Sequence, residues 1–119
     1  MLPNRVRLST TATHKMQYMK GQTGITPNIL ARVAIMLAIN EGSNLKNAGV
    51  SDFDGQVLEK SVLFGEHADV YDVLINQYII ENKIDIDTQK TIASLVEIGV
   101  HKMGHIKNLA DICNLGDKS

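Results

Sequence analysis

The stretch GQTGITPNILARVAIMLAINEG, residues 21–42, decides how the rest of the chain must be arranged. Thr26 followed by Pro27 predicts a helix start, because proline at the first helical position gives up no hydrogen bond. Gly42 is a typical residue to follow the end of that helix. Ten of the fifteen residues from 27 to 41 are apolar, so almost no polar face remains. Such a helix must be covered on several sides, partly by its own chain and partly by another copy.

The size and composition of the chain predict one ordered domain that spans residues 1–119. Of the 119 residues, 44% are hydrophobic and 21% are charged, which is typical of a globular protein. No apolar run approaches the roughly 20 residues that cross a bilayer. The N-terminal MLPNRVRLST lacks the apolar segment of a signal peptide. We therefore expect a cytoplasmic protein with no membrane partner.

The net charge of −1 hides two parts of opposite sign. Residues 41–119 hold seven lysines and all thirteen acidic residues, which gives −6, whereas residues 1–40 carry +5 and no acid. Neutralisation of phosphates by Lys and Arg supplies most of the affinity for nucleic acid. The basic part is therefore predicted either to face a polyanion or to pair with acidic residues of its own fold or of a neighbouring subunit. Its cations are Arg5, Arg7, Lys15, Lys20 and Arg32.

A short strand and a first helix precede the apolar stretch. RVRLS alternates, which places Arg5, Arg7 and Ser9 on one face of a strand and two apolar residues on the other. STTATHKMQYMKG then predicts an amphipathic helix that starts at Ser9, Thr10 or Thr11 and ends at Gly21. Its apolar stripe is Ala12, Met16 and Met19, and beside that stripe lie His14, Lys15 and Lys20.

Several further elements are predicted after Gly42. Residues 43–56 are rich in Gly, Asn, Ser and Asp, which indicates a flexible surface connection, with DFDG at 52–55 as a turn. KSVLF at 60–64 is a candidate short strand, and residues 68–82 predict a third helix. Asp87 is the expected N-cap of a fourth helix whose buried side is Ile92, Leu95, Val96 and Met103, and residues 108–115 predict a last short helix.

The sequence contains none of the strong catalytic or metal-binding motifs. His101 and His105 stand one helical turn apart and could share a metal ion with Cys113. However, Gly104 interrupts that helix and no complete set of four ligands can be assembled. We expect surface or structural histidines and an inert, packed thiol. The prediction is therefore a protein that is not an enzyme and that binds neither a metal nor a cofactor.

The N-terminal third resembles a known DNA-binding unit. Residues 4–42 resemble the ribbon-helix-helix unit. They contain a strand with outward cations, a first helix, a turn with glycine and a capped second helix. In that unit two chains pair their strands into a ribbon that lies in DNA. The expected fold class is mainly α: a short N-terminal strand followed by a helical domain of about four to five helices, ribbon-helix-helix-like in its first third.

A closer resemblance covers nearly the whole chain. Four segments together resemble the DndE family, the small subunits of the bacterial DNA phosphorothioation system. They are LPNRVRLSTTAT, TGITPNILARVAIMLAINEG, LFGEHADVYDVLI and GVHKMGHIKNLADICNL. The TGITPN turn and the LFGE segment are the most specific parts. The resemblance implies a self-associating, DNA-binding accessory protein. Such a protein works with other modification proteins that replace a non-bridging phosphate oxygen by sulfur, and it needs no active site of its own.

Two main functions therefore stay open. The first is an accessory subunit that contacts the sugar-phosphate backbone of double-stranded DNA, with a preference for nicked duplex. The second is a protein-interaction subunit that does not bind DNA, and a ribbon-helix-helix repressor is a third alternative. Lys90, Lys102 and Lys107 are expected to lie outside the DNA surface. The predicted DNA-binding residues are Arg5, Arg7, His14, Lys15 and Lys20.

Self-association is the other expectation. The apolar surface of residues 27–41 predicts a homo-oligomer of even copy number, a dimer or a tetramer. Glycines in the turn before this helix either allow close approach between subunits or serve only as helix-end and turn residues. The predicted interface residues are Gly21, Gly24, Ile29, Val33, Met36 and Leu37.

Overall fold

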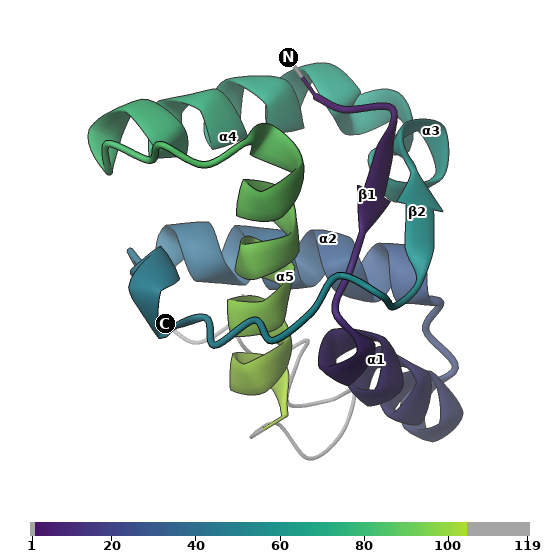
Figure 1. Cartoon of the computed structure of the whole chain (residues 1–119). Helices are drawn as coiled ribbons and strands as arrows, with labels where there is room; N and C mark the ends of the chain where they lie inside the picture. Colours follow the sequence, from purple (N-terminus) through teal and green to yellow (C-terminus); the bar gives the residue numbers. More distant parts are fainter. Residues whose placement is uncertain (1, 105–119) are drawn as a thin grey trace, which may run out of the picture.

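The computed structural model describes residues 2–104 and is mainly helical, with a short N-terminal strand (Figure 1). The expected fold class is confirmed. The last helix predicted, at residues 108–115, lies outside the described residues together with Cys113. The elements are β1 (Arg5–Arg7), α1 (Thr10–Thr23), α2 (Pro27–Asn40), the 3-10 helix η1 (Leu45–Asn47), β2 (Val57–Glu59), α3 (Lys60–Leu63), the 3-10 helix η2 (Gly65–His67), α4 (Ala68–Glu81) and α5 (Thr88–Met103).

The central helix of the fold is α5. Every residue from 91 to 100 is buried, and α2, α1 and β1 all pack against this helix (Figure 1). Gly99 allows α5 and α2 to pack closely, because a Cβ atom at this position would lie 2.1 Å from the carbonyl oxygen of Ala34. By contrast, α2 buries only one face, and Ile29 on its other side is 44% exposed. The helix enclosed on every side is therefore α5, and a single chain covers one face of α2.

The two strands form an antiparallel pair within the chain. Arg5 lies opposite Glu59 and Arg7 opposite Val57. The strand predicted at residues 60–64 is wrong, since the strand ends at Glu59 and α3 follows at once. Leu63 and Phe64 are both fully buried. Adjacent residues of a strand would point to opposite faces, whereas a helical turn brings both into the core.

Helix α1 begins where the sequence predicts and ends later. Ser9 has an extended backbone, and its hydroxyl accepts a hydrogen bond from Ala12 N at 2.9 Å. The helix continues through Gly21 to Thr23, and Gly24, with a φ of 76°, ends it. Glycine adopts this left-handed conformation at no steric cost. The predicted starts of the next long helices, Thr26–Pro27 for α2 and Asp87 for α5, are confirmed.

The connection between α2 and β2 is fastened to α1 rather than free. Oδ1 of Asp52 accepts hydrogen bonds from Thr10 N at 2.9 Å and from Asp54 N at 3.0 Å. The predicted DFDG turn is thereby confirmed, because a carboxylate bonded two residues ahead defines such a turn. A Cβ on Gly55 would lie 2.3 Å from the carbonyl oxygen of Ser9. The expected flexible link is therefore a closely packed segment.

The helices are short relative to a bilayer. Within residues 2–104 no single helix is long and apolar enough to cross a membrane. Only α1 and α2 taken together reach that length and composition, and they form a pair bent by 112°.

Candidate nucleic-acid interface

The outer face of β1 presents two arginines. Arg5 and Arg7 are exposed while Val6 between them is fully buried, as the alternation predicts. Arg5 Nε lies 3.1 Å from Glu59 Oε1 in a pair that is exposed on both sides. Such surface pairs contribute little free energy, so a phosphate can compete for the guanidinium. Among residues 2–104, the side chain of Arg7 has no hydrogen-bond or ion-pair partner.

Gln89, in the first turn of α5, fixes the edge of β1 that faces away from β2. Its Oε1 accepts a hydrogen bond from Arg7 N at 2.5 Å, and its Nε2 donates one to Arg7 O at 3.0 Å. The side-chain amide thus occupies both backbone groups of Arg7, as a neighbouring strand would. The pairing of β1 is therefore intramolecular on both sides, in place of the two-chain ribbon that the ribbon-helix-helix resemblance implies.

A cleft of about 420 Å³ opens beside this edge. Three cations line it, two from β1 and one from the start of α5, and no carboxylate belongs to the part of its lining that the structure describes. An aromatic ring and an aliphatic side chain supply its apolar wall. The lining residues are Arg5, Arg7, Phe53, Val57, Gln89 and Lys90.

Lys90 lies beside the two arginines of β1, whereas the sequence predicted a position away from them. It was expected outside the basic surface because it stands in the acidic part of the chain, yet folding sets it in the same cleft as Arg5 and Arg7. Lys102 is occupied elsewhere, since its Nζ lies 2.5 Å from Glu41 Oε2. Lys107 lies outside the described residues.

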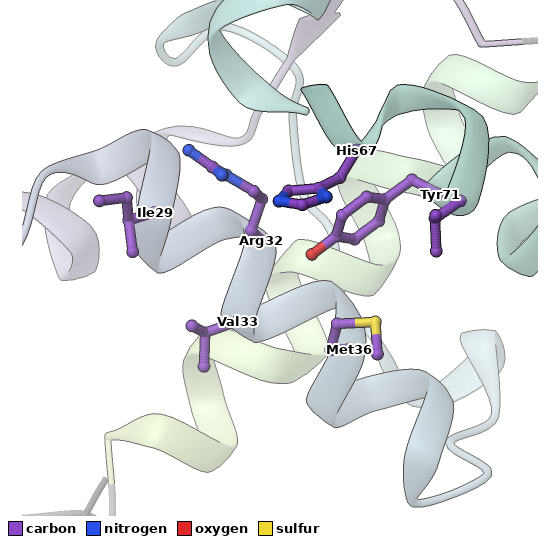
Figure 2. Close-up of a pocket in the computed structure, with 7 residues that line it drawn as sticks. Ile29, Arg32, Val33, Met36, His67 and Tyr71 are labelled. Atoms are coloured by element: carbon purple, nitrogen blue, oxygen red, sulfur yellow. The ribbon is translucent and has the colours of Figure 1, made fainter. Parts of the chain in front are cut away.

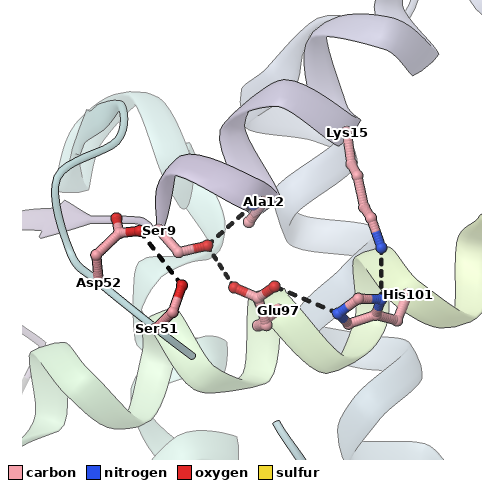
Figure 3. Close-up of polar contacts among 7 residues, drawn as sticks. All are labelled: Ser9, Ala12, Lys15, Ser51, Asp52, Glu97 and His101. Carbon is pink, nitrogen blue, oxygen red and sulfur yellow. Dashed lines mark hydrogen bonds and ion pairs between the residues drawn. The ribbon is translucent and has the colours of Figure 1, made fainter. Parts of the chain in front are cut away.

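The cations of α1 divide into free and engaged side chains. His14 and Lys20 are exposed. Lys15 is half-buried, and its Nζ lies 2.5 Å from Nδ1 of His101 on α5 (Figure 3). Lys15 is thus held by a neighbouring helix, whereas His14 and Lys20 project into solvent.

A buried carboxylate stands at the centre of the polar network in Figure 3. Glu97 is 2% exposed, accepts a hydrogen bond from the Ser9 hydroxyl, and lies 3.3 Å from His101 Nε2. Ser9 is 1% exposed, which corrects its expected place on the outer face beside Arg5 and Arg7. It turns inward because its hydroxyl caps α1 and also donates to Glu97.

The order of this network differs from that of a catalytic Ser–His–carboxylate triad. A nucleophilic serine donates its proton to an imidazole, whereas the Ser9 hydroxyl donates to a carboxylate and His101 lies beyond it. A buried carboxylate needs such partners simply to offset the loss of hydration. We assign Ser9, Glu97 and His101 to the joining of α1 to α5.

A second, mostly apolar groove of about 470 Å³ separates α2 from α4 (Figure 2). Val70 is 56% exposed at its rim. Nε of Arg32 is buried and has no hydrogen-bond partner among the described residues. Burial raises the pKa of Tyr71, and the charge of Arg32 opposes that shift. Three of the predicted interface residues line this groove, which is formed by Ile29, Arg32, Val33, Met36, His67, Val70 and Tyr71.

The remaining predicted interface residues lie apart from one another. Leu37 is half-buried on α2. Gly24 has a positive φ that the end of α1 requires, which accounts for this glycine without a partner. Gly21 has an ordinary helical conformation, and a Cβ added there would meet no atom within 4 Å among the described residues. The fold of one chain therefore explains Gly24 and leaves Gly21 unexplained.

The described residues bring no metal-binding cluster together. No group of three or more His, Cys, Asp or Glu side chains within residues 2–104 is placed to hold a metal ion. His105 and Cys113, two of the three candidate ligands, lie outside this range.

Sequence comparison decides the family. The family model of the DNA sulphur modification protein DndE matches residues 5–111, which is most of the chain. The protein belongs to the DndE family. No curated protein matches the sequence.

Solved DndE structures share the fold of this DndE-family chain. DndE from Escherichia coli B7A, described as involved in DNA phosphorothioation modification, is 31% identical, with a TM-score of 0.73. The match covers 87% of this chain and 97% of that one. A DndE G21/24K mutant, described as involved in DNA phosphorothioation, is 27% identical, with a TM-score of 0.70 and coverage of 87% and 99%.

Four residues that line the cleft beside Arg5 and Arg7 in this DndE-family protein were missed from the sequence: Phe53, Val57, Gln89 and Lys90. Gln89 and Lys90 follow the predicted N-cap Asp87, so their place in the first turn of α5 was predictable, but their place beside β1 was not. Phe53 did carry a local signal. It is an aromatic residue between two aspartates in a polar turn, where an apolar side chain needs a neighbour to cover it.

Proposed function

We propose that this DndE-family protein is a non-catalytic, oligomeric accessory subunit of DNA phosphorothioation that binds the sugar-phosphate backbone of duplex DNA. The observation that carries the proposal is the cationic cleft. Arg5 and Arg7 from β1 and Lys90 from α5 line one hollow that has no carboxylate in its described lining. Arg7 and Lys90 have no ion-pair partner among residues 2–104, and the pair of Arg5 with Glu59 is exposed, so these cations can attract phosphate and release bound counterions on contact.

The polar side chains near this face favour contacts to phosphate over the reading of bases. Gln89 uses both ends of its amide on Arg7. Asn28, one of the amides that could read a base, donates from Nδ2 to Val62 O at 3.3 Å. An amide that reads a base edge in a groove must be free, and both of these amides are engaged within the chain. We therefore expect affinity that depends little on sequence.

Self-association would repeat this modest positive charge over a wider surface. The groove between α2 and α4 exposes Ile29 and Val70 together, and each is about half exposed. A second copy of the chain could cover this face and give a dimer or a tetramer. Nicked duplex would be favoured over intact duplex because an interrupted strand bends more easily onto a rigid surface. The other partners that we propose for this chain are the other phosphorothioation proteins.

A salt titration tests the DNA-binding proposal. Fluorescence anisotropy with a labelled duplex should show affinity that falls steeply with salt concentration. Replacing Arg5 and Arg7 by alanine should weaken binding to all sequences and lower the log–log slope by roughly one unit per lost phosphate contact in each engaged subunit. Lys46→Ala is the matched control, because Lys46 is exposed in η1 and lines a different cleft, with Tyr78 and Lys83. An equal loss with Lys46→Ala would contradict the assignment.

A protein-interaction subunit that does not bind DNA is the second candidate. The apolar groove favours it, as does Arg32 Nε, which has no hydrogen-bond partner among residues 2–104. A partner segment could supply both an apolar side chain and a hydrogen-bond acceptor. The absence of salt-sensitive binding to any duplex would decide for this candidate. The intramolecular pairing of β1 counts against the ribbon-helix-helix repressor, which needs that strand for a partner chain.

A further inference from the structure

We infer that the cleft lined by Arg7, Lys90 and Phe53 takes one nucleotide whose base lies outside the helical stack. Its phosphate would lie between Arg7 and Lys90, and its base would lie against the ring of Phe53. The inference rests on the proposed DNA binding and adds to it a site of defined size and chemistry.

The backbone that carries two cations of the cleft is held in place before any ligand arrives. Two hydrogen bonds from the Gln89 side chain fasten the backbone of Arg7 to the first turn of α5. Lys90 is the next residue of that turn, so the backbone positions that carry the two cationic side chains are fixed relative to one another. Neither side chain has a partner among residues 2–104. The two backbone positions are thus preorganised, which lowers the conformational entropy lost on binding, and both cationic side chains remain free to contact a phosphate.

The aromatic side of the cleft is equally well anchored. Phe53 stands between Asp52 and Asp54 in the turn that Asp52 closes on Asp54 N. The same carboxylate binds the backbone and the hydroxyl of Thr10, which ties the turn to α1. The carboxylate of Asp52 is thereby engaged on the turn and on Thr10. The ring of Phe53 is half-buried and lines the cleft together with Val57.

The size and wall of the cleft select the ligand class. Its volume of about 420 Å³ falls in the range of small-ligand sites, roughly 300–1,000 Å³. A phosphate group alone would leave the apolar wall of Phe53 and Val57 exposed to water. Bases inside a duplex have both faces covered by their neighbours, so only an unstacked base can use that wall. Stacking on an aromatic ring tolerates any base, which agrees with binding that does not depend on sequence.

A duplex with one extrahelical nucleotide tests the inference on the whole protein. Its affinity is compared by anisotropy with that of the intact duplex and of the same duplex in which the extrahelical nucleotide lacks its base. We expect the protein to bind the extrahelical base about tenfold more tightly than the intact duplex. Removal of that base should abolish the preference.

Variants of Phe53 separate this site from general DNA binding. Phe53→Leu should lose the preference for the extrahelical base, and Phe53→Tyr should retain it. Tyr18→Leu, which removes a 70% exposed aromatic residue from α1, is the matched control and should keep the preference. Circular dichroism and thermal unfolding identify any variant that fails to fold.

Three outcomes are distinguishable. A preference that depends on both the base and Phe53 supports the inference. Equal affinity for the three duplexes, or a preference that survives Phe53→Leu in folded protein, overturns it and leaves the proposed function standing. Absence of binding to every DNA form overturns both.

Discussion

Gly99 of α5 lies against the backbone of Ala34 in α2 with no room for a side chain between them. A Cβ atom on Gly99 would be 2.1 Å from the Ala34 carbonyl oxygen and 2.4 Å from its carbonyl carbon. The atoms that would be met belong to the backbone, so no rotation of a side chain can relieve the contact. This crossing sets the distance between the two helices that build the core.

Gly99→Ala should therefore destabilise the protein despite the better helix propensity of alanine. We expect the free energy of unfolding to fall by about 1–3 kcal/mol, the usual effect of overpacking. Gly21→Ala is the matched control, because Gly21 is also helical but an added Cβ meets nothing within 4 Å in the described chain. Urea unfolding followed by circular dichroism measures both. A Gly99→Ala variant as stable as the native protein would contradict the close crossing.

Gln89→Leu should weaken DNA binding without removing a charge. The variant leaves the backbone N–H and carbonyl of Arg7 without their partners, at about 1 kcal/mol of stability per hydrogen bond. Arg7 then loses its fixed position beside Lys90, so duplex affinity should fall in folded protein. Gln77→Leu on α4, where the amide donates a hydrogen bond to Glu81 at 2.8 Å, is the control and should keep full affinity. Anisotropy at fixed salt concentration distinguishes the two.

The free energy of unfolding should depend on pH in acid through the carboxyl group of Asp52. Hydrogen bonds from Asp54 N and from Thr10 lower the pKa of its carboxyl below the ordinary 3.8. Because the pKa is lower in the folded chain than in the unfolded chain, this stabilisation is fully present above pH 3.8 and is lost as the pH falls through the folded value. Unfolding free energies measured across this window should depend less on pH in Asp52→Asn.

The control for that experiment is Asp69→Asn, an exposed carboxylate at the start of α4. It should retain the acid dependence of the native protein. If Asp52→Asn and the native protein lose stability in parallel below pH 3.8, the turn does not depend on the ionised carboxylate.

Glu97→Ala should reduce stability rather than remove an activity. The Ser9 hydroxyl would lose its acceptor in a buried position, a loss that costs about 1–3 kcal/mol. Glu97→Gln keeps an acceptor for Ser9 and should be less destabilising. Thermal unfolding measures both, and Glu81→Ala on the exposed side of α4 is the control. A DNA-cleaving activity of the native protein that disappears in Glu97→Gln would contradict the structural role.

Gly21→Lys should dissociate the proposed oligomer while the subunit stays folded. Gly21 has an ordinary helical backbone and open space around it in the chain, so lysine there causes no internal strain. Gly24→Lys is the comparison, because a positive φ of 76° makes any side chain unfavourable at that site whatever the assembly. Light scattering gives the particle mass and circular dichroism the helix content. An unchanged oligomer in Gly21→Lys places the interface elsewhere, with Ile29 and Met36 as the next candidates.

The elements of this fold follow from short stretches of sequence. Pro27 after Thr26 and Asp87 before Thr88 start their helices as predicted, because a proline at the first helical position and a side chain that caps the first turn act on a few neighbouring residues. The alternation at Arg5, Val6 and Arg7 likewise gave the correct outward and inward faces. The predicted strand at 60–64 failed because two adjacent apolar residues must both reach the core, a demand set by the surrounding chain.

The position of each element in the fold was decided only by tertiary packing. The more apolar helix, α2, lies half at the surface, whereas α5 is enclosed because Gly99 allows it to press against Ala34. The cleft joins Arg7 to Lys90 across more than eighty residues of chain, through the side chain of Gln89. Charge counted along the sequence assigned Lys90 to the acidic part. Electrostatic attraction depends on distance in space, and that distance is set by which helices pack together.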